Sequence, residues 1–402
     1  VYAVNANNGR MRWSSSQRWF AVSVISGSLA FHDDVLYVPI STFETALAGV
    51  DAYPCCRSHG GVAAIDALNG ELLWKYETTA HAVKVGRTSA GTDTWGPSGA
   101  AVWTTPAIDA ERGRIYIGTA QNMSPPATHT SDAVIALDMA TGEEVWVYQA
   151  LAGDIWNVAC HLGRANCPEP AGPDFDFGGG ITLVTGSSGR DIIVAGQKSG
   201  QVHALDPDRS GAVIWQRRLS QGTSNGGIHW GVAASSDTVW VTIADPPRQR
   251  DGYVPKPGIH ALDLATGQVR WSQLVERGCD FDPAASPRIG LVAMQDTAPE
   301  DRWPDCSFYY GHSAAPLQAN GVVYAGALDG RLRLLDADTG EILRVIETNR
   351  EFDTINGIAG HGGAIDLSGV VVDGDRMFVY SGYGMFGQMP GNVLLAWELR
   401  SR

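Results

Sequence analysis

The sequence predicts an all-β chain, a β-propeller built of four-stranded antiparallel blades. A phrase recurs along its 402 residues, in which a short apolar strand ends in Asp or Asn, Gly follows four or five residues later, and Trp comes four residues after the Gly. Such recurrence is the signature of a repeat architecture. A single blade cannot bury both faces of its sheet, and radial stacking of blades solves that problem. The copies of this repeat phrase are Asn5-Gly9-Trp13, Asp66-Gly70-Trp74, Asp138-Gly142-Trp146, Asp206-Gly211-Trp215, Asp263-Gly267-Trp271 and Asp336-Gly340-Arg344.

Each repeat phrase predicts a hairpin between the last two strands of a blade. Runs such as Val134 to Leu137 and Ile259 to Leu262 are short and apolar. The Asp that follows favours an Asx turn, and the Gly can adopt a positive φ. Upstream, two further runs, Val102 to Ile108 and Arg114 to Thr119, are joined by a short turn. We therefore expect four strands in each blade, A to D in chain order.

The two ends of the chain predict incomplete blades. Val1 to Val4 matches strand C of a blade whose A and B strands would precede it, which indicates an N-terminal truncation. Asn392 to Leu399 matches another strand C with no D hairpin after it. With five complete blades between them, seven blades are represented in one domain that spans residues 1–402. An eighth blade upstream of Val1 is left open.

Composition narrows the classes of partner. The chain is 44% hydrophobic and 18% charged, which allows a large core. Its formal net charge of -14 argues against nucleic acid, because phosphate binding needs a basic surface. No apolar run approaches the ~20 residues that cross a membrane as a helix. We expect an acidic soluble protein with no nucleic-acid partner and no membrane span.

The cysteines form three pairs that are local in the sequence. Neither a haem-attachment motif nor a zinc spacing is present, so the pairs predict disulfides in an oxidising compartment, periplasmic or secreted. Adjacent Cα atoms lie ~3.8 Å apart, less than the ~4.4–6.8 Å usual across a disulfide, so a bond within the first pair would not serve stability. That pair is either two free or separately paired thiols, or a rigid, polarizable plate at a ligand site. The pairs are Cys55 with Cys56, Cys160 with Cys167, and Cys279 with Cys306.

Long insertions between the repeats predict the functional face. In an up-and-down blade, the B–C loops and the links to the next blade emerge opposite the tight hairpins, and all the long segments are of these two kinds. They are 41–60, 77–101, 120–131, 149–179, 245–257 and 273–311.

Candidate ligands stand on that face. Histidines before strand A of three successive blades are expected to ring a central channel and to bind an anionic or polar group; they are His229, His312 and His361. Carboxylate and amide oxygens at the ends of strands B suit Ca²⁺, and they belong to Glu44, Gln121 and Asn122. Lys198 also follows a strand B, and taken alone it is interpreted as an ordinary turn lysine.

Six motifs carry a family resemblance. They are Tyr-Pro-Cys-Cys (53–56), Ser-Gly-Ala-Ala-Val-Trp (98–103), Gly-Asp-Ile-Trp (153–156), Gly-Pro-Asp-Phe-Asp-Phe-Gly (172–178), Gly-Gln-Lys-Ser-Gly (196–200) and Gly-Gly-Ile-His-Trp-Gly (226–231). Together with the repeat phrase they resemble the pyrroloquinoline quinone (PQQ) dependent alcohol dehydrogenases, and among them the polyvinyl alcohol dehydrogenases. The resemblance spans essentially the whole chain. Because non-catalytic propellers of the outer-membrane assembly type share the repeat phrase, a protein-interaction scaffold is the alternative.

The resemblance implies an eight-bladed enzyme that holds PQQ and Ca²⁺. It would oxidise a secondary alcohol, polyvinyl alcohol or a related polyol, and pass electrons to a c-type cytochrome. Trp103 would lie beneath the cofactor and a Cys55–Cys56 disulfide above it, with Lys198 beside the reactive quinone oxygen. The calcium ligands would be Glu44, Gln121 or Asn122, and Asp174. Further cofactor contacts would come from Arg57, His59, His229, His312 and Gly387.

The resemblance also implies an Asp as the general base. In the family an Asp directly follows the Trp of the Asp-x-Trp run, but here Asn157 follows Trp156, and an insertion with two cysteines intervenes. Asp174 then stands at the offset before the next strand that is expected of the base, which must be ionised to work. Asp154 is the second choice; otherwise it would orient the loop. Asp176 is expected to be structural.

Overall fold

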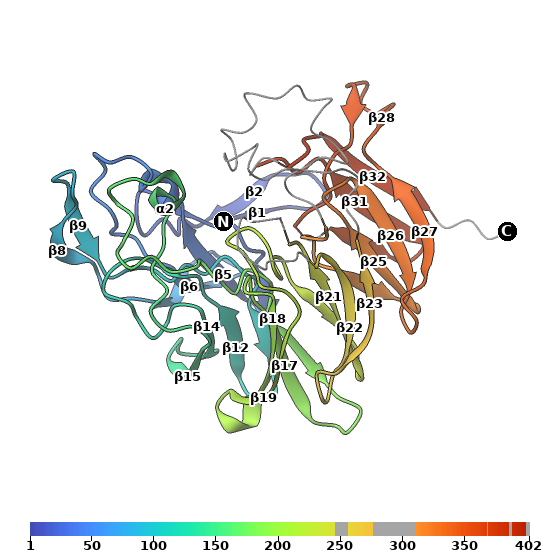
Figure 1. The fold of residues 1–402 in the computed structure, drawn as a ribbon, viewed down its shortest axis with the longest axis horizontal. Helices are drawn as coiled ribbons and strands as arrows, with labels where there is room; N and C mark the ends of the chain where they lie inside the picture. The colour runs from blue at the N-terminus through green and yellow to red at the C-terminus, as the bar shows by residue number, and fades with distance from the viewer. Residues whose placement is uncertain (246–255, 276–310, 368, 386–387, 399–402) are drawn as a thin grey trace. The chain divides into compact units, whose positions relative to one another are not determined.

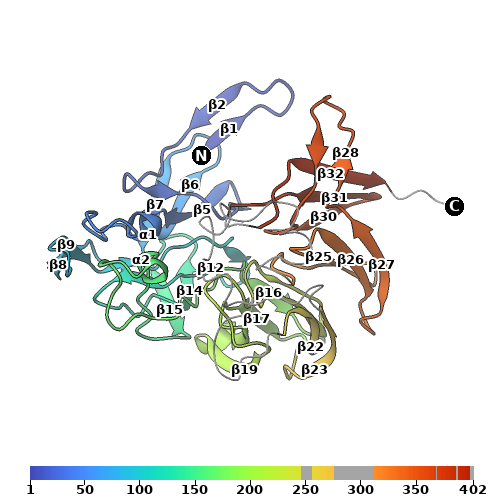
Figure 2. The ribbon, with the colours of Figure 1, turned by 45° about the horizontal axis from the view of Figure 1, so that its top comes forward.

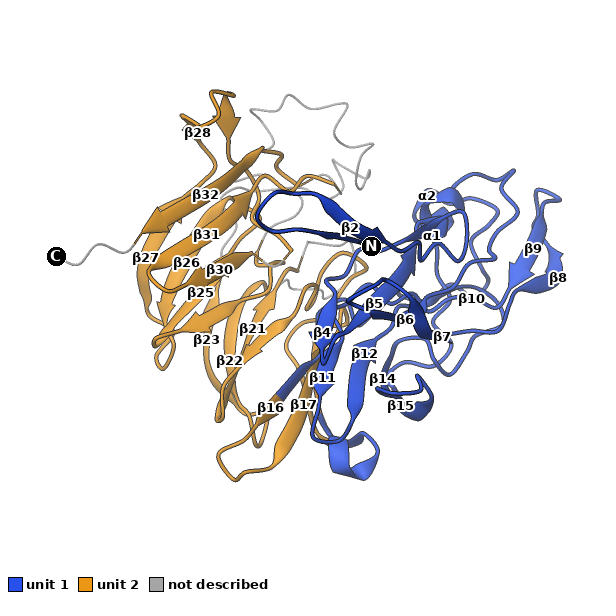
Figure 3. Cartoon of the chain, turned by 180° about the vertical axis from the view of Figure 1, so that it is seen from behind, with its two compact units in different colours: residues 1–183, 205–212 blue, residues 184–204, 213–402 orange. Residues whose placement is uncertain are grey.

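The computed structural model describes residues 1–245, 256–275, 311–367, 369–385 and 388–398, and most regular elements in them are β-strands (Figure 1). The chain divides into two compact units, residues 1–183 with 205–212 and residues 184–204 with 213–402 (Figure 3). Among the described helices, none has the length and apolar character of a membrane span.

The first unit holds a two-stranded half blade and two full blades. In the half blade, β1 (Tyr2–Val4) pairs with β2 (Met11–Ser14). The first full blade is β4 (Ala30–His32), β5 (Val35–Thr42), β6 (Gly61–Asp66) and β7 (Leu72–Glu77), and β3 (Ser23–Val24) also pairs with β5. The second is β11 (Ala107–Asp109), β12 (Arg114–Gly118), β14 (Ala133–Asp138) and β15 (Glu144–Gln149).

Short elements occupy the long segments of the first unit. Each of the helices α1 (Glu44–Leu47) and α2 (Ala159–Leu162) has four residues, whereas η1 (Pro207–Arg209) is a 3-10 turn inside the tight turn of the repeat phrase Asp206-Gly211-Trp215. β10 (Ser98–Gly99) pairs with β13 (Asn122–Ser124). The hairpin of β8 (Val83–Arg87) and β9 (Asp93–Gly96) lies apart from the blade sheets of its unit (Figures 1 and 2).

The second unit holds most of one blade and all of two more. The first of these sheets is β16 (Thr182–Thr185), β17 (Asp191–Gly196), β18 (Gln201–Asp206) and β19 (Ala212–Arg218). The next is β20 (Val232–Ala234), β21 (Thr238–Ile243), β22 (Gly258–Asp263) and β23 (Val269–Leu274). The last is β24 (Leu317–Ala319), β25 (Val322–Gly326), β26 (Arg331–Asp336) and β27 (Ile342–Glu347).

Two smaller sheets complete the described part of the second unit. β30 (Val370–Asp373), β31 (Arg376–Ser381) and β32 (Val393–Glu398) form a three-stranded sheet, in which β32 matches the expected final strand C. β28 (Glu351–Phe352) pairs with β29 (Gly360–His361). Within the described residues, the five complete four-stranded blades expected from the repeat phrase are confirmed.

One predicted strand is wrong. The sequence predicts strand A over Val102 to Ile108, but only β11, which starts at Ala107, belongs to the sheet. The residues before it are irregular because neighbouring segments satisfy their backbone groups. Val102 N–H donates to the Ile40 carbonyl at 3.1 Å, and the Ala101 carbonyl accepts from Ala120 N–H at 2.9 Å. Trp103 therefore lies outside the blade, and its side chain is half-buried.

The Trp of each repeat phrase packs on the Gly of the next one. A Cβ added to Gly70 would lie 2.6 Å from the Trp13 ring, and one on Gly267 would lie 2.5 Å from the Trp215 ring. Equivalent pairs are Trp74 with Gly142, Trp146 with Gly211 and Trp271 with Gly340. In four of these pairs, the indole N–H donates to the carbonyl after the next Asp, as Trp74 does to Met139 at 3.1 Å. The structural role expected for these tryptophans follows from this contact.

Candidate functional site

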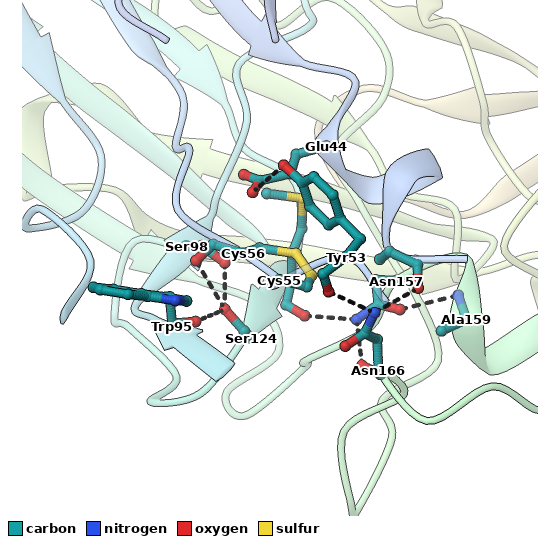
Figure 4. The surroundings of a disulfide bond; sticks show 12 residues. Glu44, Tyr53, Cys55, Cys56, Trp95, Ser98, Ser124, Asn157, Ala159 and Asn166 are labelled. Carbon is teal, nitrogen blue, oxygen red and sulfur yellow. Dashed lines mark hydrogen bonds between the residues drawn. A yellow bond between two sulfur atoms is a disulfide. The ribbon is translucent and has the colours of Figure 1, made fainter. Parts of the chain in front are cut away.

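A buried carboxylate organises the loop that carries the adjacent cysteines. Glu44 is 1% exposed at the start of α1, in the first unit. Its oxygens accept from the Tyr53 hydroxyl and the Arg57 N–H, each at 2.9 Å, and from the Ser58 N–H at 2.6 Å and the Ser58 hydroxyl. Burial, followed by the Glu44 charge, raises the pKa of Tyr53. These donors compensate the buried charge and fix residues 53–58 around it. Figure 4 shows Glu44 beside Tyr53 and the two cysteines.

The adjacent cysteines form a disulfide. Cys55 and Cys56 are bonded to each other and are 2% and 0% exposed. Their backbones exchange hydrogen bonds with Trp95 of β9, from Trp95 N–H to the Cys55 carbonyl at 2.8 Å and from Cys56 N–H to the Trp95 carbonyl at 3.2 Å. The interpretation as free or separately paired thiols is thus wrong. Cys160 and Cys167 are also bonded, whereas Cys279 and Cys306 lie outside the described residues.

Trp95 is a site residue that the sequence did not reveal. The exposed Arg57 guanidinium carbon lies 3.8 Å from the centroid of the Trp95 ring, which is a cation–π contact. Within the described residues, the buried indole N–H of Trp95 has no acceptor. Trp95 belongs to no repeat phrase or motif in the sequence. It contacts the cysteines only because the hairpin of β8 and β9 folds against them.

The His59 side chain contacts residues of its own blade and is not exposed to a ligand. Its ring is fully buried, its Nε2 lies 3.2 Å from a Glu77 carboxylate oxygen, and its centroid is 4.8 Å from that of Phe20. Burial lowers the pKa of His59, an effect that the Glu77 carboxylate partly opposes. Lys75 also contacts Glu77, at 3.2 Å. A cofactor contact by His59 therefore stays a prediction without geometric support.

The two candidate amides differ in how their oxygens are used. Asn122 is fully buried, its Oδ1 accepts from Thr128 N–H at 2.8 Å, and its amide donates to the Ser98 carbonyl at 2.9 Å. The Gln121 amide donates to the Trp156 carbonyl at 3.1 Å, and no donor among the described residues reaches its Oε1. Of the two, Gln121 is the better placed to offer an oxygen to a cation.

Two carboxylates hold the backbone around Asp174. Asp154 accepts from the N–H groups of Asp174 at 3.3 Å and Phe175 at 2.9 Å, and Asp176 accepts from Gln121 N–H at 3.1 Å. Asp174 is 4% exposed and has φ +63, a left-handed conformation that L-residues adopt at an energetic cost. Gly172 allows this geometry because a side chain there would overlap the Asp154 carboxylate. Asp154 thus fixes the backbone of the loop at Asp174 and Phe175.

In the second unit, two of the sequence motifs pack together. Lys198 is 4% exposed in the turn between β17 and β18. Its carbonyl accepts from Thr223 N–H at 3.2 Å, and Ile228 N–H donates to the Gln197 carbonyl at 3.2 Å. Gly227 has φ +65, and a Cβ on it would overlap the Lys198 carbonyl. The segments 196–200 and 226–231 therefore form one structural element.

The histidines before strand A differ from one another. His229 is buried, with Nδ1 3.0 Å from the Ser313 hydroxyl, and burial together with the Lys198 charge lowers its pKa to about 3. His312 is fully buried and its Nδ1 lies 2.8 Å from the Gly326 carbonyl, so its ring is engaged by strand β25. His361, in contrast, is exposed on β29. Gly387 lies outside the described residues.

Asp366 is a second residue that sequence reasoning missed. It is 1% exposed and accepts from Leu367 N–H at 2.9 Å and the Gln388 amide at 3.1 Å. Burial raises its pKa to about 6, although the neighbouring Ser313 and Trp230 side chains favour its ionised form, which lowers its pKa. Its surroundings, Ala-Ile-Asp-Leu-Ser, carry no recognisable motif.

Known proteins resemble this chain over most of its length. The family model of the glucose/ethanol/alcohol dehydrogenase β-propeller domain matches residues 45–161, and that of the outer membrane protein assembly factor BamB matches residues 131–298 and 198–345. The chain is 33% identical to a polyvinylalcohol dehydrogenase of Pseudomonas sp and 34% identical to one of Sphingopyxis sp. (strain 113P3). Each alignment covers 99% of this chain and 60% of the relative, so the chain spans less than two thirds of their length.

A solved structure supports the fold. The quinohemoprotein alcohol dehydrogenase from Comamonas testosteroni matches with a TM-score of 0.60 at 17% identity, over 98% of this chain and 63% of that chain. The dehydrogenase family model covers the segment with Cys55, Cys56, Trp103 and Gln121. On these grounds the chain is a β-propeller whose sequence is similar to that of PQQ-dependent alcohol dehydrogenases.

Proposed function

We propose that this chain is the propeller of a periplasmic or secreted, PQQ- and calcium-dependent dehydrogenase. It oxidises a secondary alcohol, polyvinyl alcohol or a related polyol, and passes the electrons to a c-type cytochrome. The observation that carries the proposal is Asp174, a buried carboxylate held in a left-handed conformation by the hydrogen bonds of Asp154. A buried carboxylate whose backbone is fixed by a second carboxylate is a candidate general base.

The roles of the chain's own residues follow from their surroundings. PQQ, when bound, accepts the hydride equivalent of the alcohol carbon. Asp174 takes the proton of the alcohol hydroxyl, and Asp154 keeps its backbone in place. Lys198, nearly buried in its turn, supplies positive charge where negative charge develops. Arg57, stacked on Trp95, supplies a cation for a cofactor carboxylate.

The support for a calcium site comes from the types of oxygen ligand present, and not from a set of ligands already gathered in one place. Glu44 provides a buried carboxylate and Gln121 an amide oxygen without a donor, both hard ligands. No three His, Cys, Asp or Glu side chains gather as a metal site in the described ranges. Because both Glu44 oxygens already accept hydrogen bonds, binding a cation would require the Tyr53 and Ser58 hydroxyls to turn away.

The alternative is a non-catalytic scaffold of the BamB type. The BamB model matches only from residue 131 onward, over the repeat phrases, whereas the dehydrogenase model matches 45–161, which includes the disulfide and Trp103. This difference favours the enzyme.

Dye-linked turnover separates the two functions. The chain is incubated with PQQ and CaCl₂, and reduction of an artificial electron acceptor is followed with a secondary alcohol. Wild type should turn over, and Asp174→Asn should lose about 10²–10⁴-fold in kcat while it still binds PQQ, because only the base is removed. Full activity in Asp174→Asn would move the base to Asp154, and a wild type that binds no PQQ would favour the scaffold.

A further inference from the structure

The disulfide-closed loop 157–167 lies against the segment that leads to Cys55 and Cys56. Its Asn166 is 8% exposed, and its amide nitrogen lies 3.0 Å from the carbonyl oxygens of Ala48 and Val50 and 3.1 Å from that of Tyr53 (Figure 4). Three carbonyl neighbours fix which atom of the amide is nitrogen, since an oxygen there would accept nothing. The Asn166 side chain thus binds three carbonyl groups of the segment that precedes the Cys55–Cys56 disulfide.

The loop itself is held rigidly where it carries Asn166. Asn157 donates to the Met123 carbonyl and to the Asn166 carbonyl, each at 2.9 Å, and its Oδ1 accepts from Ala159 N–H at 3.0 Å. The Cys160–Cys167 disulfide closes the same loop. The residue after Trp156 is therefore a structural amide, which is consistent with its being Asn where the family has the base.

A second set of contacts brings the same two segments together. Val158 N–H donates to the Thr45 carbonyl at 3.2 Å, and Ala165 N–H donates to the Asp51 carboxylate at 2.8 Å. The loop thereby touches the segment 45–53 from both of its ends. That segment connects Glu44, whose carboxylate fixes residues 53–58, with the disulfide.

We propose that Asn166 is a positioning residue for the Cys55–Cys56 disulfide, and that the Cys160–Cys167 loop is the brace which holds it. The proposal rests on the proposed function in one respect, that the disulfide is a cofactor contact. Truncating Asn166 leaves three carbonyls without their shared donor, so the segment 48–53 loosens and the disulfide loses its fixed position.

The test compares Asn166→Ala with Arg164→Ala, a change in the same loop. Arg164 is 56% exposed and only approaches Asp51 at 3.6 Å, so its loss should change nothing. Hydrogen exchange of the backbone amides of Cys56, Arg57 and Ser58 is measured by mass spectrometry. We expect faster exchange in Asn166→Ala and wild-type rates in Arg164→Ala; unchanged exchange in Asn166→Ala overturns the brace, whether or not PQQ binds.

Cofactor affinity provides the second readout. PQQ is titrated into each variant, and Asn166→Ala should bind it about tenfold more weakly, by analogy with the loss of affinity when the hydrogen bonds that support metal ligands are removed. If Asn166→Ala does not fold, the double variant Cys160→Ser/Cys167→Ser takes its place with the same expectation. Folded variants with wild-type affinity contradict the proposal, whereas absent PQQ binding by wild type with altered exchange rejects only the proposed function.

Discussion

Asp366 shows how a single buried carboxyl links stability to pH. Burial raises its folded-state pKa to about 6, above the ~3.9 of an unfolded Asp. Protonation therefore favours the folded state, so this contribution is complete below about pH 4 and is lost as the pH rises through about 6. At neutral pH, Asp366 is ionised and retained by its donors Leu367 and Gln388.

Asp366→Asn should remove this dependence, because the amide has the same shape and does not titrate. Relative to wild type, its free energy of unfolding in urea should rise by about 1 kcal/mol between pH 5 and pH 7.5. A difference between variant and wild type that stays constant over this range would show that the carboxyl does not titrate there. Asp375→Asn, in the turn between β30 and β31, is the matched control and should show no such change.

At the residue scale, the sequence predicted side chains that lie in motifs and missed those that depend on packing. Asp154, Asp174 and Lys198 were identifiable from the motifs around them. Trp95 and Asp366 were not, because their partners come from segments that are distant in the sequence. For the same reason, the burial of His59 against Glu77 could not be anticipated.

The repeat phrase is the element whose energetics the structure explains best. Gly9 and Gly267 both have φ +68, yet a Cβ at Gly9 meets nothing within 4 Å, whereas one at Gly267 would lie 2.5 Å from the Trp215 ring. Both glycines therefore avoid left-handed strain, but only Gly267 also makes room for a tryptophan. Substitutions at these two positions therefore distinguish the energetic cost of the backbone conformation from that of the packing between repeats.

Gly9→Ala should destabilise the fold by about 1–2 kcal/mol, the usual cost of a left-handed L-residue. Gly267→Ala should add about 1–3 kcal/mol for the displaced indole. Urea denaturation of the two variants measures both quantities. Equal losses would mean that the Trp215 ring adapts without cost and that the contact is not a specific brace between repeats.

Elements were predictable where local chemistry decides them. The run Val134 to Leu137 lies within β14, and the Asp138 carboxylate accepts from Ala140 and Thr141 N–H at 2.9 Å, which is the expected Asx turn. The residues from Val102 to Pro106 are not a strand, and the Val102 N–H donates to the Ile40 carbonyl instead of to a partner in the blade sheet. An apolar run predicts that its side chains are buried. It does not predict which segment will form hydrogen bonds with its backbone.

One Trp shows that the repeat contact adapts to its neighbours. Trp146 packs on Gly211, but its indole N–H has no acceptor among the described residues. The carbonyl in the equivalent position belongs to Pro207, and it accepts from the Arg114 guanidinium at 3.1 Å. The packing of ring on Gly is thus the constant part of the contact, and the hydrogen bond is its variable part.

At the scale of the whole molecule, the repeats form the blade sheets, and the long segments between them carry the candidate site residues. The tight turns of the repeat phrase recur from blade to blade, while Glu44, Cys55, Trp95, Asp154 and Asp174 all lie in the long segments that separate the blade strands. The fold, and the similarity to the dehydrogenases, could be inferred from the repeat phrase and motifs. The brace by loop 157–167 could not, because no motif in the sequence marks Asn166 as its contact.

Binding of PQQ with the help of Ca²⁺ is the property on which the proposed activity of this chain depends, and a spectroscopic titration measures it. PQQ is added to the metal-stripped chain with and without CaCl₂, and absorbance changes and quenching of tryptophan fluorescence are recorded. We predict saturable binding of one PQQ per chain that tightens with Ca²⁺ and is lost in Glu44→Gln. Unsaturable binding, or binding that neither Ca²⁺ nor Glu44→Gln affects, would contradict a calcium-assisted PQQ site.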